Sequence, residues 1–598
     1  MKRSDGSSMI KRRQFLIGAM GAGVSMGVMS LSGCSLISGT SQASAGPTGA
    51  FPTKWSKPLT VTVFDDLANY QGMQTGWFAA LVQKKFNIKL NVIAPNVAGG
   101  GETLFNTRSA AGDLGDLVVL GSAQHLTQAA KGGLLYDASP FTKNMTSTQK
   151  YEAAVKFTNT GQKGTVAFPS SVSSRKPNQP SEGADPTFGP YVRWDLYGKV
   201  GYPQVNTLED LLPVFQEMQK ASPKAPNGKP TYAFSLFKDW DGNMMTAAKQ
   251  PACYYGFDEM GFVLAAADGS SYESIIDSDS HYVRALRFFH KGTQMGLMDP
   301  DSPTQNFSTQ NAKFQNGQVL YCFWPWVCKA AYNTDANMNA GRGFEMLDLK
   351  DAKIFSYGAQ PLGSSSNSIG IGIKAQDPQR MAAFIDWLYS ADGIYANGSQ
   401  TGSAPGPKGL TWELPKKGDP QLTAFGKNAM LGGSTDQVPA GWGSGTYAKG
   451  VSALNVTLVT AVDEDPATGQ PFLVNEWPSY LKLTSNALTR NWTSRMGGAQ
   501  TTMGFLESHG QLSIGAGSGY VAPQDSAEIQ TLRNQIKSVI VQASWRMSMS
   551  SSDSDFDSQL KEMQSTAKGL GYDKVQAVDM EHAKAQNDAR IAIVKKFG

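Results

Sequence analysis

Predicted strands and helices alternate from residue 59 to residue 120, and this alternation restricts the chain to few folds. Segments 59–64, 88–93 and 117–120 are rich in β-branched and aliphatic residues and predict strands. Segments 77–86 and 102–111, which lie between them, have the apolar spacing of helices. A strand–helix–strand order predicts parallel βαβ units. We therefore expect an α/β fold.

The N-terminal segment has the features of an export signal. The run Lys11-Arg12-Arg13 forms a basic region, and a short apolar segment rich in Gly, Ala and Met follows it. The paired arginines before Phe-Leu resemble a twin-arginine signal, with the general export route as the alternative. Leu-Ser-Gly-Cys, which ends at Cys34, resembles a bacterial lipobox in which the cysteine is lipidated. A transmembrane anchor is disfavoured because glycines interrupt the short apolar segment.

Charge gives no sign of a nucleic-acid partner. The chain carries 53 basic and 49 acidic side chains, net +4. Residues 1–33 hold five basic side chains and one acidic side chain, which is also net +4. The chain after the signal is therefore formally neutral, and we expect it to bind neither nucleic acid nor an acidic partner surface.

Three cysteines remain after Cys34, namely Cys253, Cys322 and Cys328. An odd number makes a poor disulfide framework. Cys322 and Cys328 could close a small loop, but we favour buried thiols.

The segment 314–329 is the main candidate for a binding surface. Its β-prone run 319–323 must end before Pro325, which cannot donate to a sheet ladder. Trp324 and Trp326 would then follow the carboxyl end of a strand, where open α/β sheets bind ligands. An indole offers a flat apolar face and an N–H donor, which suits a sugar ring. The alternative, above all for Trp324, is that the ring fills the core.

The order of motifs resembles that of family 1 extracellular solute-binding proteins, the sugar-binding proteins of ABC importers that include maltose-binding protein. The likeness is to the long, lipid-anchored Gram-positive branch. Gly112-Asp113-Leu114-Gly115-Asp116 resembles the GDLPD signature of this family, with Gly115 in place of proline. Further motifs follow in order at 163–169, 191–207, 296–300, 314–317, 369–373, 384–393 and 554–572.

The resemblance implies a periplasmic-binding-protein-like (type II) fold, with two α/β lobes joined by a hinge and a ligand cleft between them. The first lobe would comprise residues 59–170 and 358–440, and the second residues 185–355 and 441–598. Residues 35–58, rich in Ser, Gly, Ala, Thr and Pro, would form a flexible tether after the signal. The role of the segment 398–523 stays open.

The resemblance also implies ligand contacts. The Pro-Trp pair of this family stacks on sugar, which favours Trp326. Other candidates lie in two polar loops and in two further tryptophan-bearing loops: Asp65, Asp66, Asn69, Ser122, Gln124, Trp240 and Trp442. Ordinary solvation or helix capping is the alternative for the loop residues.

The implied function is capture of a carbohydrate, an oligosaccharide in our expectation, and its delivery to a two-subunit ABC permease. The protein would act as a monomer without cofactor, held on the extracellular face of the membrane by lipid on Cys34. One rival is a secreted glycoside hydrolase, which needs two carboxylates about 5–10 Å apart across a cleft. The other is the same fold binding a peptide or another solute, with fewer stacking rings and more charge in its cleft.

Metal and catalytic motifs are weak. The run 553–557 mimics the start of an EF-hand loop, but Ser558 and Gln564 stand where that loop needs Gly and Glu. We interpret the run as a helix start, with acids near the positive end of the helix dipole. The sequence contains neither an HExxH motif nor a GxSxG elbow. We therefore expect no metal and no catalytic residue.

Overall fold

The computed structural model describes residues 50–98, 100–364, 366–431 and 435–598. The predicted export signal 1–34, its lipidation site Cys34 and the first part of the predicted tether lie outside the described residues. In the described part of the chain, no helix is both long and apolar enough to cross a membrane.

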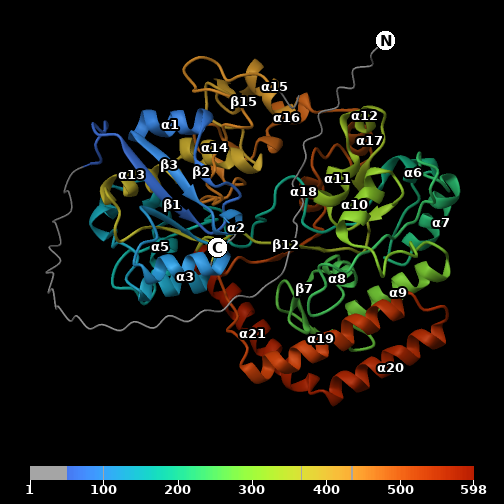
Figure 1. The fold of residues 1–598 in the computed structure, drawn as a ribbon. Helices are drawn as coiled ribbons and strands as arrows, with labels where there is room; N and C mark the ends of the chain where they lie inside the picture. The colour runs from blue at the N-terminus through green and yellow to red at the C-terminus, as the bar shows by residue number, and fades with distance from the viewer. Residues whose placement is uncertain (1–49, 99, 365, 432–434) are drawn as a thin grey trace, which may run out of the picture. The chain divides into compact units, whose positions relative to one another are not determined.

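A six-stranded sheet (Figure 1) organises the first of the two largest hydrophobic cores among the described residues. Its strand order is β2-β3-β1-β4-β13-β5. The strands are β1 (Leu59–Asp65), β2 (Gly72–Met73), β3 (Ile88–Ile93), β4 (Leu117–Leu120), β5 (Phe168–Pro169) and β13 (Ser368–Ile371). Strand β1 runs parallel to β3 and β4, as the alternation predicts, whereas β13 runs antiparallel to β4.

Helices cover both faces of this sheet. They are α1 (Gly76–Phe86) and α13 (Pro378–Leu388) on one face, and α3 (Gly101–Ala110) and α4 (Ala123–Lys131) on the other. Val63 and Val119 enter the cluster under α1 and α13, whereas Phe64 and Val118 enter the cluster under α3 and α4. Adjacent side chains in a strand point to opposite faces. Burial on both faces therefore explains the uninterrupted apolar run of β4.

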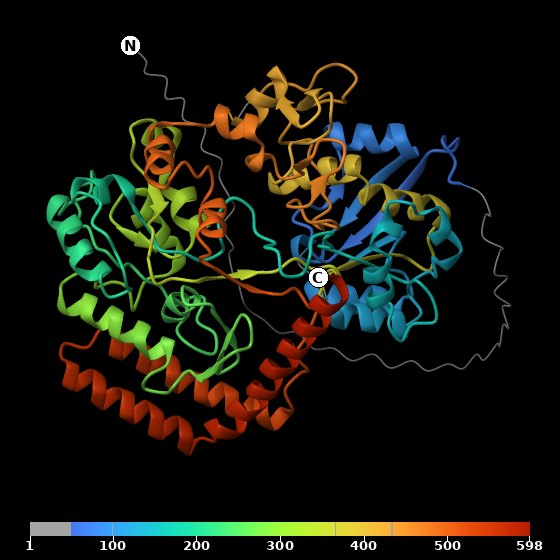
Figure 2. The same cartoon turned by 180° about the vertical axis from the view of Figure 1, so that it is seen from behind.

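The second core is built from helices around two three-stranded sheets, β10-β6-β11 and β7-β8-β9. The strands are β6 (Tyr191–Arg193), β7 (Phe257–Met260), β8 (Val263–Ala266), β9 (Tyr272–Ser274), β10 (Tyr321–Cys322) and β11 (Phe344–Met346). The helices are α6 (Trp194–Lys199), α7 (Leu211–Ala221), α8 (Thr246–Cys253), α9 (His281–Gln294), α10 (Phe307–Gln315), α11 (Pro325–Tyr332), α17 (Ala487–Arg495), α18 (Thr502–Ser508), α19 (Ala527–Ser548) and α20 (Asp553–Gly569). Figure 2 shows α19 and α20, in red, lying along α9.

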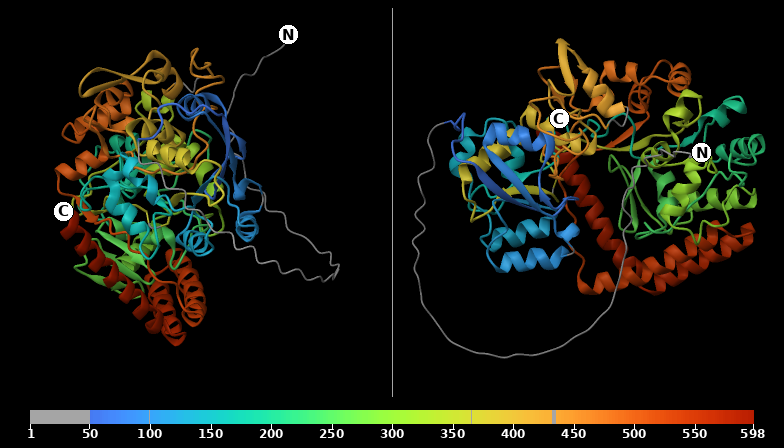
Figure 3. Two further views of the ribbon diagram at one scale, coloured as in Figure 1. Left: turned by 90° about the vertical axis from the view of Figure 1, so that its left-hand side faces the viewer. Right: turned by 45° about the horizontal axis from the view of Figure 1, so that its top comes forward.

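A strand pair and the last helix are among the described features that link the cores. Strand β12 (Ile354–Tyr357) pairs in parallel with β18 (Leu512–Gly515). The last helix, α21 (Tyr572–Phe597), begins in the second core, where Val575 is buried. It then extends away from α19 and α20, the other red helices in Figure 3. Near its end, Ile593 packs with Leu362 and Ala516. The helix thus contacts the segments that connect the two cores.

The packing differs from the expected division into lobes. Tyr447, Leu454 and Trp477 belong to the first core, although residues 441–598 were expected to form part of the second lobe. The Trp77 Nε1 donates to the Tyr447 carbonyl at 3.0 Å, and the two rings stack with centroids 5.7 Å apart. Residues 441–483 have no strong helical or strand period, so long-range contacts decide where they pack.

The end of the expected tether also packs on the first core. Phe51 and Trp55 are partly buried there, and the Asn87 side chain donates to the Trp55 carbonyl at 3.0 Å. The Arg380 guanidinium lies 4.8 Å from the centre of the Trp55 ring. The packed body therefore begins before Leu59, because two aromatic rings in an otherwise small and polar stretch find an apolar surface.

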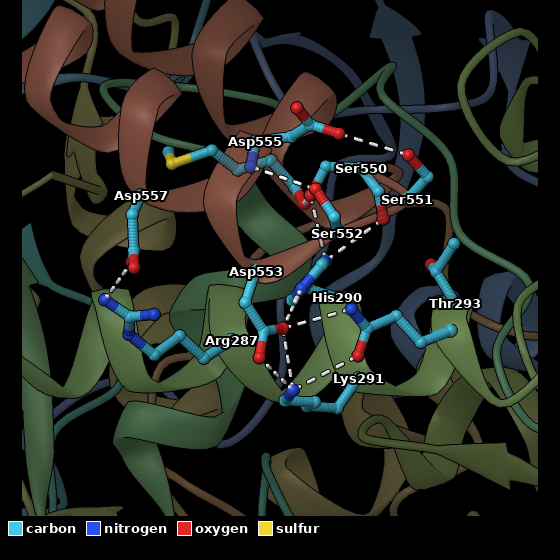
Figure 4. A network of polar contacts seen from close by, with 12 residues as sticks. Arg287, His290, Lys291, Thr293, Ser550, Ser551, Ser552, Asp553, Asp555 and Asp557 are labelled. Atoms are coloured by element: carbon cyan, nitrogen blue, oxygen red, sulfur yellow. Dashed lines mark hydrogen bonds and ion pairs between the residues drawn. The ribbon is translucent and has the colours of Figure 1, made fainter.

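The acidic run that mimics an EF-hand is the first turn of α20, as predicted. Ser552 caps the helix by accepting the backbone N–H of Asp555 at 3.1 Å. Figure 4 shows the Asp553 carboxylate facing Lys291 and His290 of α9. Asp553 Oδ1 lies 2.7 Å from Lys291 Nζ and 2.9 Å from His290 Nε2. Hydrogen bonds from these two side chains hold the pKa of Asp553 well below its ordinary value. The acids therefore join α20 to α9. Among the described residues, no group of three or more His, Cys, Asp or Glu side chains could hold a metal ion.

Candidate ligand-binding site

A strand end and a proline separate the two tryptophans of the central motif. Strand β10 ends at Cys322, and Trp324 is the N-cap of α11. Pro325 occupies the first turn of α11, where its missing N–H costs no hydrogen bond. The Trp326 side chain is 53% exposed, whereas Trp324 is 6% exposed. The prediction that the strand stops before Pro325 is confirmed, and Trp324 is mainly a core residue.

Trp326 belongs to a cluster of aromatic rings, which we call the aromatic platform: Phe237, Trp240, Phe307, Trp324 and Trp326. The rings of Trp240 and Trp326 stack, with centroids 5.7 Å apart and planes inclined by 25°. Trp240 is 39% exposed. The buried Trp324 ring lies 5.5 Å from Trp240 and 5.9 Å from Trp326. Two exposed indoles are thus supported by a third that is buried.

Hydrogen bonds hold the loop that carries Trp240. The Asp241 carboxylate accepts from the backbone N–H of Thr246 at 2.9 Å and from the Trp545 indole at 2.7 Å. Burial outweighs these bonds and raises the pKa of Asp241. Within the platform, the indole of the buried Trp324 donates to the Gln250 side chain at 3.1 Å. Rings held this way lose little conformational entropy when a ligand stacks on them.

The structure corrects the expectation for Asp65. Its side chain is completely buried at the end of β1. One carboxylate oxygen accepts from the backbone N–H of Leu67 at 2.9 Å, and the other from that of Asn455 at 3.1 Å. Burial raises the pKa of Asp65 to about 6, although these hydrogen bonds oppose the change. Asp65 therefore holds the loop in place instead of facing a ligand.

Asp66, the next residue, lies in a different environment. Its Oδ2 accepts from the Gly121 backbone N–H at 3.0 Å and from His125 Nδ1 at 2.6 Å. The other ring nitrogen of His125 lies 2.8 Å from Glu102. Sequence reasoning missed His125 and Glu102 because no motif connects them. The only signal is that His125 follows two of the candidate loop residues.

The other candidates in the first core have varied surroundings. Ser122 is the N-cap of α4, and its hydroxyl accepts the backbone N–H of His125 at 3.1 Å, which is the capping alternative. Gln124, in the first turn of α4, and Asn69, after β1, are exposed. Trp442 is partly buried against the first core and is not part of the aromatic platform.

The cysteines of the central motif are free thiols. Cys322 and Cys328 are buried and form no disulfide, and the same holds for Cys253. Both Cys322 Sγ and Cys328 Sγ donate to the Trp324 carbonyl, at 3.2 and 3.4 Å. Burial raises the pKa of Cys328 well above its ordinary value, and the neighbouring Cys322 adds to the effect.

Comparison with known proteins gives a match in structure but not in sequence. No family model matches the chain, and no curated protein matches it. An HMO-binding, ABC-transporter-associated solute-binding protein from Bifidobacterium longum infantis matches with TM-score 0.55 and 14% identity, over 88% of this chain and 99% of its own. An extracellular solute-binding protein from Bifidobacterium longum subsp. infantis matches with TM-score 0.53 and 14% identity, over 90% of this chain and 100% of its own.

A third similar structure is the ABC-transporter substrate-binding protein FusA of S. pneumoniae in complex with kestose. It matches with TM-score 0.54 and 12% identity, over 88% of this chain and 99% of its own. All three are named as binding proteins, and each is covered almost completely. The predicted fold class is thereby confirmed. The chain has the mixed α/β, periplasmic-binding-protein-like fold of the solute-binding proteins of ABC transporters.

Proposed function

We propose that this protein is the extracellular solute-binding component of an ABC importer and that it captures an oligosaccharide. The observation that carries the proposal is the stacked, exposed pair Trp240–Trp326 on a fixed aromatic platform. Flat indole faces that are already ordered suit the apolar face of a sugar ring. Two of the similar structures are named for sugar ligands, HMO and kestose, which supports the carbohydrate class.

In the proposed mechanism, a sugar stacks on Trp326 and Trp240, while polar groups of the first core, with Asp66 foremost, accept hydrogen bonds from its hydroxyls. The two cores correspond to two lobes, with residues 441–483 counted in the first. The ligand favours a closed form only by its higher affinity for that form. The loaded monomer then docks on the permease, and lipid on Cys34 keeps it at the outer face of the membrane.

Tryptophan fluorescence of the purified protein, titrated with neutral and acidic oligosaccharides and with peptides, tests this function. We expect saturable binding of an unmodified oligosaccharide, and calorimetry supplies its affinity. Trp326→Ala should weaken binding by about 2 kcal/mol, roughly thirtyfold. Trp326→Phe, which keeps a flat ring, should lose less. Trp442→Ala, measured in parallel, tests the predicted tryptophan contact that lies outside the platform.

Each alternative predicts a different outcome. If peptides bind and no sugar changes the fluorescence, the fold assignment stands but the ligand is not a carbohydrate. Slow release of shorter sugars during long incubation would identify a hydrolase. If Trp326→Ala binds the ligand as tightly as the unaltered protein does, the aromatic platform is not part of the binding site.

A further inference from the structure

Asp66 is a carboxylate with one oxygen fixed and one oxygen open. Its backbone N–H donates to Val119 at 3.1 Å, and its carbonyl accepts from the Asn96 side chain at 3.0 Å. Oδ2 accepts from Gly121 and His125, as described above. In the described part of the chain, Oδ1 has no hydrogen-bond partner. A charged acceptor held in this way suits a ligand hydroxyl, because charge-assisted hydrogen bonds are strong and directional.

His125 is itself held from three sides. Nδ1 faces Asp66 at 2.6 Å, and Nε2 faces Glu102 of α3 at 2.8 Å. The Phe105 ring stacks on the imidazole, with centroids 3.8 Å apart and planes inclined by 5°. The side chains of His125 and Asp66 are 14% and 9% exposed, whereas Glu102 is 58% exposed. Among the described residues, Asp66 and Glu102 supply the charged groups that contact the ring.

This arrangement requires a protonated ring. An imidazolium donates from both nitrogens, but a neutral imidazole carries only one N–H. Both partners of His125 are carboxylates, so loss of the proton must break one of the two contacts. Burial lowers the pKa of His125, but the hydrogen bonds and charges of Asp66 and Glu102 outweigh it, and the net change is upward.

We propose that His125 is a positioning residue that aims the Asp66 carboxylate at the ligand, and that affinity falls when His125 loses its proton. The proposal rests on the proposed function, because it takes Asp66 Oδ1 as a ligand contact. The direction of the pH effect follows from the two contacts of His125 with Asp66 and Glu102. Both contacts are present below the ordinary pKa of histidine, and one of them is lost as the pH rises through the raised pKa of His125.

The first arm of the test needs no ligand. NMR of the imidazole resonances from pH 5 to pH 9 follows the histidines, and His125→Gln identifies the signal of His125. We expect this signal to titrate above about pH 6.5, the ordinary value. Glu102→Gln should shift the titration to lower pH. A His125 signal that titrates at or below the ordinary value would overturn the proposal.

The second arm measures the affinity for kestose, or for the oligosaccharide of the panel that binds, from pH 5.5 to pH 9. Affinity should fall at least about threefold across the titration of His125. His125→Gln should bind more weakly at low pH and lose this pH dependence. Glu102→Gln, on an exposed side chain, repeats the test with little risk to folding.

His281→Gln is the matched control, because His281 Nδ1 lies 2.8 Å from Glu273 in a similar pair in the second core. It should leave the pH dependence of binding unchanged. A pH-independent affinity of the unaltered protein, or a pH dependence that survives in His125→Gln, would overturn the positioning role. If no sugar binds, the proposed function fails, while the NMR arm still decides whether the His125 contacts exist.

Discussion

The rings of Trp240 and Trp326 stack at a centroid distance of 5.7 Å, although Trp240 lies in the loop before α8 and Trp326 lies in the first turn of α11. Neither indole alone offers a wide stacking surface, and each ring covers part of the other. The Asp241 contacts with Thr246 and Trp545 hold the Trp240 loop against the second core. The binding surface that we propose therefore depends on the packing of segments that are distant in the chain.

Trp240→Ala should weaken oligosaccharide binding by about 1–2 kcal/mol, because it removes one stacking face and leaves Trp326 free to turn. Calorimetry with the oligosaccharide that binds measures this effect. Asp66→Asn offers a comparison in the first core, since it weakens an acceptor without altering the platform. Unchanged affinity in Trp240→Ala would show that Trp326 acts alone.

Trp324→Ala should act mainly on stability. The ring is the buried member of the platform, and its indole N–H donates to Gln250. Its removal should lower the free energy of unfolding by about 3–5 kcal/mol, the usual cost of deleting a buried aromatic side chain. Chemical denaturation measures this loss. Trp326→Ala, on the exposed ring, is the matched control and should cost much less. Equal losses in the two variants would contradict the burial that separates them.

Asp65 should make stability fall as the pH rises from about 4 to about 6. Burial raises the pKa of Asp65 to about 6, whereas an unfolded aspartate titrates near about 3.9. The folded protein therefore binds this proton more tightly, and the contribution of Asp65 to the free energy of unfolding decreases by up to about 3 kcal/mol across that window.

Asp65→Asn isolates this contribution. Asparagine cannot titrate and keeps only one of the two accepted hydrogen bonds, so the variant should carry a cost that does not depend on pH. Denaturant unfolding at several pH values measures the difference between the two proteins. That difference should shrink between pH 4 and pH 6 as the buried charge forms in the unaltered protein. Parallel curves would refute the raised pKa.

The three described cysteines should resist alkylation in the folded protein. All are buried, and burial raises the pKa of Cys253 and of Cys328, so little thiolate is available. Mass spectrometry after iodoacetamide treatment should find modification of Cys253, Cys322 and Cys328 only in denaturant. Modification of Cys253 alone in denaturant would instead reveal a disulfide between Cys322 and Cys328.

Local sequence determined the parallel strands of the first core. The predicted strand 88–93 is β3 to the residue, and β1 extends the prediction 59–64 by only one residue. These segments are β-prone and face helices on both sides of the sheet, so their local preference agrees with their burial. The first turn of α20 was predictable for the same reason, because Ser552 and the acids after it favour a helix start wherever the helix packs.

Tertiary structure alone decided which candidate side chains face solvent. Trp324 and Trp326 flank the same proline, but Phe237, Trp240 and Gln250 surround the first and leave the second exposed. Asp65 and Asp66 are adjacent, but the backbone N–H of Asn455, far along the chain, donates to the carboxylate of Asp65 and not to that of Asp66. The partners of His125, like the packing of residues 441–483, come from other segments as well. Periodicity and capping act over a few residues, whereas burial and hydrogen bonding at the site join segments that only folding brings together.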